Sequence, residues 1–523
     1  MNLSWSRADL YAAKIVCLVL WHGFAVQTAH ARTITVNNTS DAVDSAPGDG
    51  VCETAKGNAK CTLRAAIQEA NAAGPVSAQI EIQVPTGSYV LRLSGMREDL
   101  AAQGDLDINT SVKITGAGRS QTIVDGSGLD RVFDIAPRPR GPIENISVSL
   151  AHLTVSEGRS DFSGGGGLRY AGKLTLEDVV VRDNTAIGPG GGLVSTNGSD
   201  DDPQLTVVDS LVTHNRASNF GGDGGGIEAT FSTRLTVLRS TISENSAAGA
   251  GGGVHAAVVA ADATFTDSVI RGNIAGAEVG LYVGGGIAAV CPKILRSTIS
   301  GNRASANGGG LQLTGVCGAE ITNSTISGNT AGTSGGGLSN SGTVTLTHVT
   351  IADNTARDLL RDAGGGIDQF GRDSRTLLNN TLVAENVPSN CGGLRITSSG
   401  HNLDDDASCD LRTAGDLTVR DPGLLPLADN GGFAFTHALR ANSPAVDAAV
   451  RGGTIVEDER GLPRPADGDG DTRIASDIGA YELGAKKPEP PPEKPTTDKP
   501  TPDEPTPQKP DHPSLDWPVC NPD

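Results

Sequence analysis

Three aspartates at alternate positions form the clearest cation-binding pattern in this chain. Asp467, Asp469 and Asp471 lie in the glycine-rich stretch DGDGD. Carboxylates at every second residue of a flexible loop can converge on one hard cation, and Ca²⁺ takes several such oxygen ligands. The stretch lacks the glycine and the closing glutamate of an EF-hand. We expect a one-loop structural calcium site, with Asp477 as a candidate further ligand; an acidic turn without an ion is the alternative.

Glycan cleavage is the second chemistry to consider for the residues of this chain. Glycoside hydrolases place two carboxylates about 5 to 10 Å apart on one face of a site. His214 and His348 have no acid at a matching position of the repeat described below, so we expect both to face solvent. The sequence predicts no catalytic residue and no cofactor other than calcium. Five aspartates of the repeats stand at scattered offsets and are expected to be solvated strand residues: Asp178, Asp183, Asp209, Asp267 and Asp353.

A repeated phrase positions these residues. A Thr/Ser-Ile/Val segment ends in Asn, and three glycines with an aliphatic residue follow, as in TISGNRASANGGGL from Thr298. The asparagines recur at intervals of 25 to 32 residues. Such a period indicates stacked supersecondary units. The anchoring residues are Asn184, Asn215, Asn245, Asn273, Asn302, Asn329, Asn354 and Asn386.

Each repeat reads as two short strands with a bend between them. Apolar residues stand ten, eight and three positions before the Asn, for example Leu235, Val237 and Ile242. The first two alternate with polar residues as in a strand, and the change of parity before the third indicates a bend. Gly, Thr, Ser and Val dominate, which excludes a helical solenoid. We therefore predict an all-β fold, a right-handed single-stranded parallel β-helix of the pectin lyase-like kind.

The fixed residues of the repeat have structural explanations. We expect the Asn column to adopt a left-handed turn and to bond its side-chain amides to the next coil. We expect the glycines to allow close approach where the chain re-enters a strand. Between the Asn and the glycines, three repeats carry longer loops, which project on one side and are expected to form a surface that binds a partner or glycan. The apolar residues expected to bind there are Phe220, Tyr282 and Leu360.

Seven of the eight cysteines follow a leader-like segment. Positive residues precede an apolar stretch, and Ala29-His30-Ala31 predicts signal cleavage after Ala31, with an uncleaved anchor as the alternative. Neighbouring coils lie about 4.8 Å apart, within the range that a disulfide spans. The predicted pairs are Cys52 with Cys61, Cys291 with Cys317 on consecutive coils, and Cys391 with Cys409. Cys520 remains as a free thiol or an intermolecular cross-link.

Three parts of the chain resemble known protein families. The repeats resemble those of the chlamydial polymorphic outer membrane proteins. The stretch CTLRAA over Cys61–Ala66 resembles the bacterial CSLREA domain. There, helical spacing predicts an amphipathic helix that covers the open end of the core, with Arg64 and Glu69 solvated. The segments from Asp421 and Asp458 resemble the choice-of-anchor Q domain, a bacterial surface region that follows β-helical repeats.

These readings divide the chain into five parts. We expect a signal peptide over 1–31, a CSLREA-like cap over 32–104, β-helix repeats over 105–390, a choice-of-anchor Q-like region over 391–484 and a disordered Pro-rich tail over 485–523. The net charge of −20 argues against nucleic acid and anionic membranes as partners. We expect a monomeric, secreted or cell-surface protein, without a transmembrane segment after signal removal, that binds an extracellular glycan or protein without catalysis. A polysaccharide lyase or glycoside hydrolase of the pectin lyase-like fold is the alternative.

Overall fold

The computed structural model describes residues 32–73, 80–95, 98–136, 146–196, 203–219, 221–230, 232–256, 263–276, 283–315, 317–358, 362–450, 453–472 and 474–487. The chain divides into two compact units, Met1–Lys486 and Lys487–Asp523. Everything below concerns the first unit. The expected leader with Ala31, the Pro-rich tail and Cys520 lie outside the described residues.

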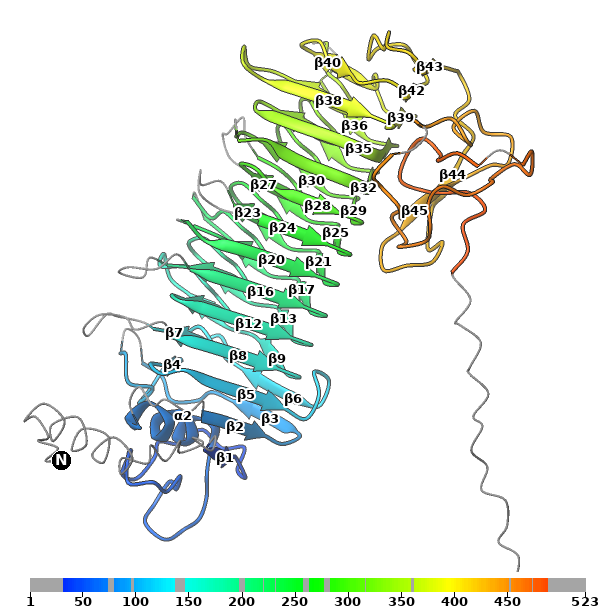
Figure 1. Ribbon diagram of the computed structural model, residues 1–523. Coiled ribbons are helices and arrows are strands. Elements are labelled where there is room, and N and C mark those ends of the chain that lie inside the picture. Colours follow the sequence, from blue (N-terminus) through cyan, green and yellow to red (C-terminus); the bar gives the residue numbers. More distant parts are fainter. Residues whose placement is uncertain are drawn as a thin grey trace, which may run out of the picture. The chain divides into compact units, whose positions relative to one another are not determined.

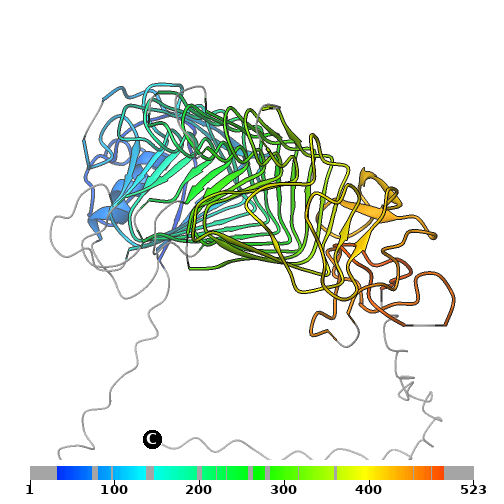
Figure 2. The ribbon, with the colours of Figure 1, turned by 90° about the horizontal axis from the view of Figure 1, so that it is seen from above.

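The first unit is a right-handed parallel β-helix, as predicted, in which each coil adds strands to three sheets (Figure 1). Sheet A receives two successive strands from most coils, sheet C one short strand and sheet B one strand. Figure 2 looks along the stack and shows successive coils following one outline. All described strand pairs are parallel except one hairpin, β44 (Leu424–Ala428) with β45 (Thr436–Leu439).

The strands of sheet A contain the two apolar segments of the repeat. They are β1 (Thr33–Thr35), β2 (Ile80–Val84), β3 (Gly87–Val90), β5 (Val112–Gly116), β6 (Thr122–Asp125), β8 (Ser147–Ala151), β9 (Thr154–Ser156), β12 (Lys173–Glu177), β13 (Val180–Arg182), β16 (Gln204–Val208), β17 (Leu211–Thr213), β20 (Arg234–Leu238), β21 (Thr241–Ser243), β24 (Ala263–Thr266), β25 (Val269–Arg271), β28 (Lys293–Leu295), β29 (Thr298–Ser300), β32 (Ala319–Ser327), β35 (Thr343–Ala352), β38 (Arg375–Asn379), β39 (Leu382–Ala384), β41 (Thr397–Ser398), β42 (Leu403–Asp404) and β43 (Leu417–Thr418).

Sheet C follows the Asn, and sheet B follows the glycines. The strands of sheet C are β10 (Arg159–Ser160), β14 (Thr185–Ala186), β18 (Arg216–Ala217), β22 (Ser246–Ala247), β26 (Ile274–Ala275), β30 (Arg303–Ala304), β33 (Thr330–Ala331) and β36 (Thr355–Ala356). Those of sheet B are β4 (Leu106–Ile108), β7 (Phe133–Ile135), β11 (Leu168–Tyr170), β15 (Leu193–Ser195), β19 (Ile227–Glu228), β23 (Val254–Ala256), β27 (Ile287–Ala289), β31 (Leu311–Leu313), β34 (Leu338–Asn340), β37 (Ile367–Gln369) and β40 (Cys391–Gly393).

Equivalent positions of successive repeats stack in register, which builds the core. Leu205 of β16 pairs with Leu235 of β20, and Val207 pairs with Val237. All four are fully buried in one continuous apolar cluster. The predicted apolar positions are therefore the inward positions of sheet A. Their burial is the main favourable contribution to the solenoid, because removal of apolar area from water dominates folding.

The asparagines form a buried ladder, and one expectation about them is wrong. The Asn215 Nδ2 and backbone N both donate to Asn245 Oδ1, each at 3.0 Å, and Nδ2 also donates to Val181 O at 2.9 Å. The inter-coil bonding is thus confirmed. The left-handed conformation, however, belongs to the preceding residue, as at His214 with φ 55°. The chain turns there, so that the following Asn side chain enters the interior.

Carboxylates close the C-terminal end of this ladder. The Asn386 Nδ2 donates to Asn390 Oδ1 at 2.9 Å, and Asn390 Nδ2 donates to Asp404 Oδ1 at 2.7 Å and Asp405 Oδ1 at 2.6 Å. Each amide of the ladder donates to the amide of the next coil, so the last amide has donors without an amide acceptor. Acceptor-only side chains at that end satisfy those donors.

The cap contains helix α2 (Leu63–Ala72), whose apolar face covers the first coils as predicted. Thr62 caps it, since its hydroxyl accepts from Ala65 N. Arg64 and Glu69 are buried, so the prediction that they are solvated is wrong. The reason is that the preceding loop folds back over the helix: Glu69 accepts Gly48 N and Gly50 N at 2.6 and 2.9 Å.

All three predicted disulfides are present. The Cα–Cα separations are 5.1 Å for Cys52–Cys61, 6.0 Å for Cys291–Cys317 and 4.9 Å for Cys391–Cys409. The second pair ties one coil to the next. The described residues include no helix that is long and apolar enough to cross a membrane.

The C-terminal region lies against the second strands of sheet A (Figure 1). Thr325 Oγ1 donates to the carboxylate of Glu459 at 2.5 Å, and Thr350 Oγ1 accepts Ala480 N at 3.0 Å. Arg464 is fully buried there and pairs with Glu482 at 2.9 Å. The contact combines these paired polar groups with a buried apolar cluster that joins Ala352 and Leu382 of sheet A to Leu439 and Ile478.

Candidate functional site

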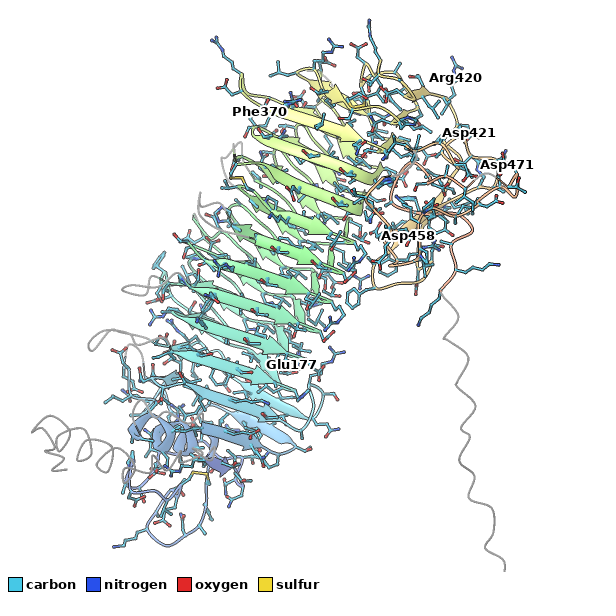
Figure 3. All side chains as sticks on the ribbon, in the orientation of Figure 1. Glu177, Phe370, Arg420, Asp421, Asp458 and Asp471 are labelled. Atoms are coloured by element: carbon cyan, nitrogen blue, oxygen red, sulfur yellow. A yellow bond between two sulfur atoms is a disulfide. The ribbon has the colours of Figure 1, made fainter. Side chains whose placement is uncertain are left out.

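The predicted calcium loop brings its three aspartates together. A carboxylate oxygen from each of Asp467, Asp469 and Asp471 lies within 4.8 Å of the others, and Asp447 supplies a fourth within the same distance. Figure 3 shows Asp471 at the outer edge of the C-terminal region. Asp477 is not part of this group. It is buried and accepts a hydrogen bond from Asp447 N at 2.9 Å, which fixes the backbone of Asp447.

Backbone hydrogen bonds hold this acidic loop. Asp467 Oδ1 accepts Gly470 N at 2.7 Å, and Asp469 Oδ1 accepts Asp471 N at 2.9 Å. The Asp447 Oδ2 is inaccessible to solvent and accepts no hydrogen bond from any residue that the structure describes. Burial, with the nearby Asp469, raises the pKa of Asp447 above its ordinary value. Oxygen ligands of this number and type suit Ca²⁺.

A second group of ionisable residues, missed at the sequence level, follows the outer face of sheet B. The middle residue of each strand points away from the core and pairs in register with its equivalent on the next coil. Asp107 pairs with Asp134, and Asp134 with Arg169. Further along the sheet, Glu228 pairs with His255. The detectable signal was the pattern apolar–charged–apolar in LDI, FDI and LRY.

The first coils hold a buried acid cluster, made of Asp105, Asp107 and Asp134. Asp134 accepts from Arg169 Nε at 3.0 Å and from Arg131 Nη1 at 3.4 Å. Arg131 Nε also lies 3.0 Å from Asp105 Oδ2. Burial and the neighbouring Asp134 raise the pKa of Asp105 to about 8. Burial and Asp105 raise the pKa of Asp107 to about 9.

Glu228 and His255 form a pair that resembles an acid–base dyad but is poorly suited to act as one. The His255 Nδ1 lies 2.9 Å from Glu228 Oε2 and 4.0 Å from Asp223 Oδ2. Burial lowers the pKa of His255, but Glu228 and Asp223 outweigh that effect and raise it to about 9. A histidine that stays protonated at neutral pH is an ion-pair partner, not a general base.

The prediction that two histidines face solvent is confirmed for His214, whose side chain is exposed, and wrong for His348, which is buried. The His214 Nε2 lies 2.6 Å from Glu244 Oε2 on the next coil, at the same repeat position. His348 is buried, with Nε2 3.0 Å from Asn380 Nδ2 and Nδ1 in contact with Arg464 Nη1. Burial and Arg464 hold the pKa of His348 well below its ordinary value.

The scattered aspartates occupy two left-handed corners instead of strands, which corrects the sequence prediction. Asp178, Asp209 and Asp267 have φ between 47° and 51°, at the bend between the two strands of sheet A. Asp183 and Asp353 have φ 57° and 59°, at the corner before the Asn. A short carboxylate side chain tolerates this conformation.

Most of these corner aspartates are ion-paired. Arg239 binds both oxygens of Asp209 at 2.8 and 2.7 Å, and Arg296 binds Asp267 at 2.7 and 2.9 Å. Asp178 lies 2.9 Å from His152 Nδ1. Stacking of coils therefore brings acidic and basic side chains together along one corner, where these groups compensate each other.

The predicted ligand residues of the long loops, Phe220, Tyr282 and Leu360, lie outside the described residues. Their expected role stays a prediction.

A match to one family model supports the fold. The family model described as "Right handed beta helix region" matches residues 252–406. Pectate lyase Pel9A is similar over 87% of this chain and 98% of its own, at 14% identity and a TM-score of 0.39. The A-module of mannuronan C-5 epimerase AlgE6 from Azotobacter vinelandii is similar over 73% and 93%, at 15% identity and 0.33. Comparison with curated protein sequences returned no match. These likenesses concern architecture, and a fold does not specify a reaction.

Proposed function

We propose that this chain is a secreted or cell-surface β-helix protein with a non-catalytic role in binding or structure. The proposal includes the signal peptide, the CSLREA-like cap and the choice-of-anchor Q-like region. Three disulfides support export, because disulfides persist in oxidising compartments. The regular coils act as a scaffold, and the irregular segments that frame them provide the contacts.

The buried state of the ionisable groups on sheet B carries this proposal. Asp107, Asp134 and Glu228 have exposed fractions of 0%, 3% and 4%. A general acid or base must come within hydrogen-bonding distance of the atom that it protonates or deprotonates. Groups covered by protein and paired with one another cannot do so without rearrangement. This arrangement favours a structural role over glycan cleavage.

Calcium at the acidic loop is the second part of the proposal. Asp447, Asp467, Asp469 and Asp471 would share one ion, which would fix the loop to the segment around Asp447. The loop joins residues that pack against the β-helix, since Arg464 and Gly479 flank it in sequence, Arg464 contacts His348, and Gly479 N donates to Asn380 O at 2.9 Å. Bound Ca²⁺ would thus stabilise the docked C-terminal region.

The long loops are the proposed ligand surface. Replacing Phe220, Tyr282 and Leu360 together with Ser should abolish attachment to immobilised glycans or cell surfaces, because apolar side chains supply most of the energy of such contacts. A matched triple variant changes Thr206, Thr236 and Thr264, which are half-buried on the outer face of sheet A, to Ser. Equal binding by both variants would remove the loops from the proposal.

Cleavage of acidic polysaccharides tests the non-catalytic role. Purified protein from residue 32 onward is incubated with a panel of uronate-containing glycans, with and without Ca²⁺. We expect no release of unsaturated or reducing uronate. Release above the rate of a heat-denatured sample would instead establish the alternative, a polysaccharide lyase or glycoside hydrolase. Loss of that release in Glu228→Gln would then locate the site on sheet B.

A further inference from the structure

The buried acid cluster has the geometry of a cation site. A carboxylate oxygen from each of Asp105, Asp107 and Asp134 lies within 4.8 Å of the others, and all three residues are at most 5% exposed. Two oxygens bound to one Ca²⁺ can be separated by up to twice the Ca–O distance, or about 5 Å. The three carboxylates therefore already stand close enough to share one ion.

One oxygen of this cluster lacks a partner. The Asp107 Oδ2 accepts Ala101 N at 2.7 Å, whereas Oδ1 is fully buried and accepts no hydrogen bond within the described part of the chain. Asp107 itself is 0% exposed. A buried carboxylate oxygen without a donor costs free energy, because it has lost its water and gained nothing in exchange. Such an atom is accounted for if it is a ligand.

The charges around the cluster are unbalanced. Asp105, Asp107, Asp130 and Asp134 face the guanidinium groups of Arg131 and Arg169. Two negative charges remain uncompensated when all four carboxylates are ionised. Either two protons or one divalent cation restores neutrality. Buried charges that are not compensated are expensive, so one of these two must be present.

We propose that Asp105, Asp107 and Asp134 bind one Ca²⁺ ion between the cap and the first coils. An all-carboxylate ligand set is typical of hard cations, and the irregular arrangement suits Ca²⁺ better than the strict octahedron of Mg²⁺. The backbone on either side of the site is already tied to helix α2. Arg64 Nη1 donates to Asp105 O at 3.0 Å, and Asn71 Nδ2 donates to Asp107 O at 2.7 Å.

The ion would join two parts of the protein. Asp105 directly precedes strand β4 and Asp107 is its middle residue, in the segment that contacts the cap helix, whereas Asp134 lies in β7 on the next coil. One Ca²⁺ therefore links the cap to the repeat. This site is independent of the acidic loop, whose aspartates come from residues 447–471.

Calcium titration of variants tests the site. The starting protein, from residue 32 to 523, carries Asp467→Asn, Asp469→Asn and Asp471→Asn, so that the acidic loop cannot bind. It is freed of metal with EGTA and titrated with CaCl₂ by calorimetry. We expect one ion per chain. Adding Asp107→Asn should weaken binding by at least about 100-fold, the upper end of what residues that merely support metal ligands contribute. Asp373→Asn, at an exposed position, is the matched control and should leave the stoichiometry unchanged.

If Asp107→Asn does not fold, the position of the bound ion in the wild-type protein tests the proposed site. Crystals of the wild-type protein soaked in Tb³⁺ should give an anomalous difference peak among Asp105, Asp107 and Asp134. Absence of calcium binding in the loop variant, equal binding with Asp107→Asn, or a Tb³⁺ peak elsewhere only would each overturn the proposal. Failure of the acidic loop to bind would instead show as one ion per wild-type chain, and would concern the proposed function alone.

Discussion

The middle coils and the two ends of this β-helix satisfy their buried polar groups in different ways. Between Ala263 and Asn340, every buried polar side chain that the structure describes is Asn, Gln, Ser or Thr. The cap and first coils bury Arg64, Glu69, Asp105 and Asp107, and the C-terminal region buries Glu459, Arg464 and Glu482. Repetition lets neutral amides and hydroxyls pair with copies of themselves. An end has no next copy, so its partners must be found among ions.

The largest effect is expected where the neutral ladder is broken. Asn273→Ala removes the oxygen that accepts from both Asn245 N and Asn245 Nδ2, each at 3.0 Å. Two buried donors without an acceptor cost about 1–3 kcal/mol each, so we expect a loss of about 4–6 kcal/mol in the free energy of unfolding when the lost donors of Asn273 are included. Urea unfolding, monitored by circular dichroism, measures this loss in the free energy of unfolding.

Thr264→Ala on the outer face of the same coil is the control, and should cost less than about 1 kcal/mol. Equal losses in the free energy of unfolding for the two variants would show that the Asn ladder does not stabilise the middle coils.

The next largest effect is expected in the cap. Arg64→Met leaves the buried carboxylate of Asp41 without its guanidinium partner, which binds it at 2.6 and 3.2 Å. Removing one member of a buried ion pair costs about 3–5 kcal/mol. Because the cap covers the first coils, protease cleavage near the N-terminal end should also increase. Unchanged unfolding of this variant would contradict the view that buried ions hold the cap.

An intermediate effect depends on pH. The folded protein raises the pKa of His255 to about 9, so the stability that its proton contributes is complete below the ordinary value of 6.5 and declines as the pH rises through 9. A shift of this size corresponds to about 3 kcal/mol across that range. The midpoint temperature of thermal unfolding should therefore fall more steeply between pH 6 and 9.5 in the wild type than in His255→Gln.

His214→Gln is the control for this series, because His214 and Glu244 are about half exposed and their pair is screened by water. If His255→Gln followed the wild-type curve, the Glu228–His255 pair would contribute nothing to stability.

The smallest effect is expected at the corner of sheet A. Arg239→Met breaks a two-point contact with Asp209, yet both side chains are over two-fifths exposed. Surface pairs of this kind contribute little to stability, because water and salt screen them. A loss comparable with that of Arg64→Met would show that exposure does not separate the two classes of ion pair.

The regular part of the fold could be predicted because its information is repeated. Asn at a fixed interval and aliphatic residues at fixed offsets revealed the strands, the bend and the Asn bonding to the next coil. The facing cysteines at 291 and 317 could be paired because they occupy equivalent positions of adjacent coils. The left-handed corner was misplaced by one residue, because the prediction followed the recurring Asn, although the position before it carries Gly272, Gly301 and Gly328, which adopt positive φ.

The ends could be predicted only in part, because their contacts join residues that share no spacing. The three aspartates of the DGDGD stretch are adjacent in sequence, but Asp447 reaches them through the tertiary fold. Arg64 and Glu69 have the spacing of exposed helix residues, but the loop before the helix covers Glu69, and the segment at Gly104 covers Arg64. His348 faces outward from its coil and is buried by Arg464, which lies 116 residues later.

Hydrogen exchange at two pH values tests the central difference between middle and ends most directly. Amide exchange is measured in EGTA at pH 6 and pH 9 and corrected for the intrinsic rate. Protection should fall over residues 41–136 and 421–486, because pKa values raised to about 8 at Asp105, about 9 at Asp107 and about 7 at Glu482 mean that these carboxyl groups lose their protons between the two pH values. Protection over residues 263–340 should not change. A loss that began in those coils, or was uniform along the chain, would contradict the account.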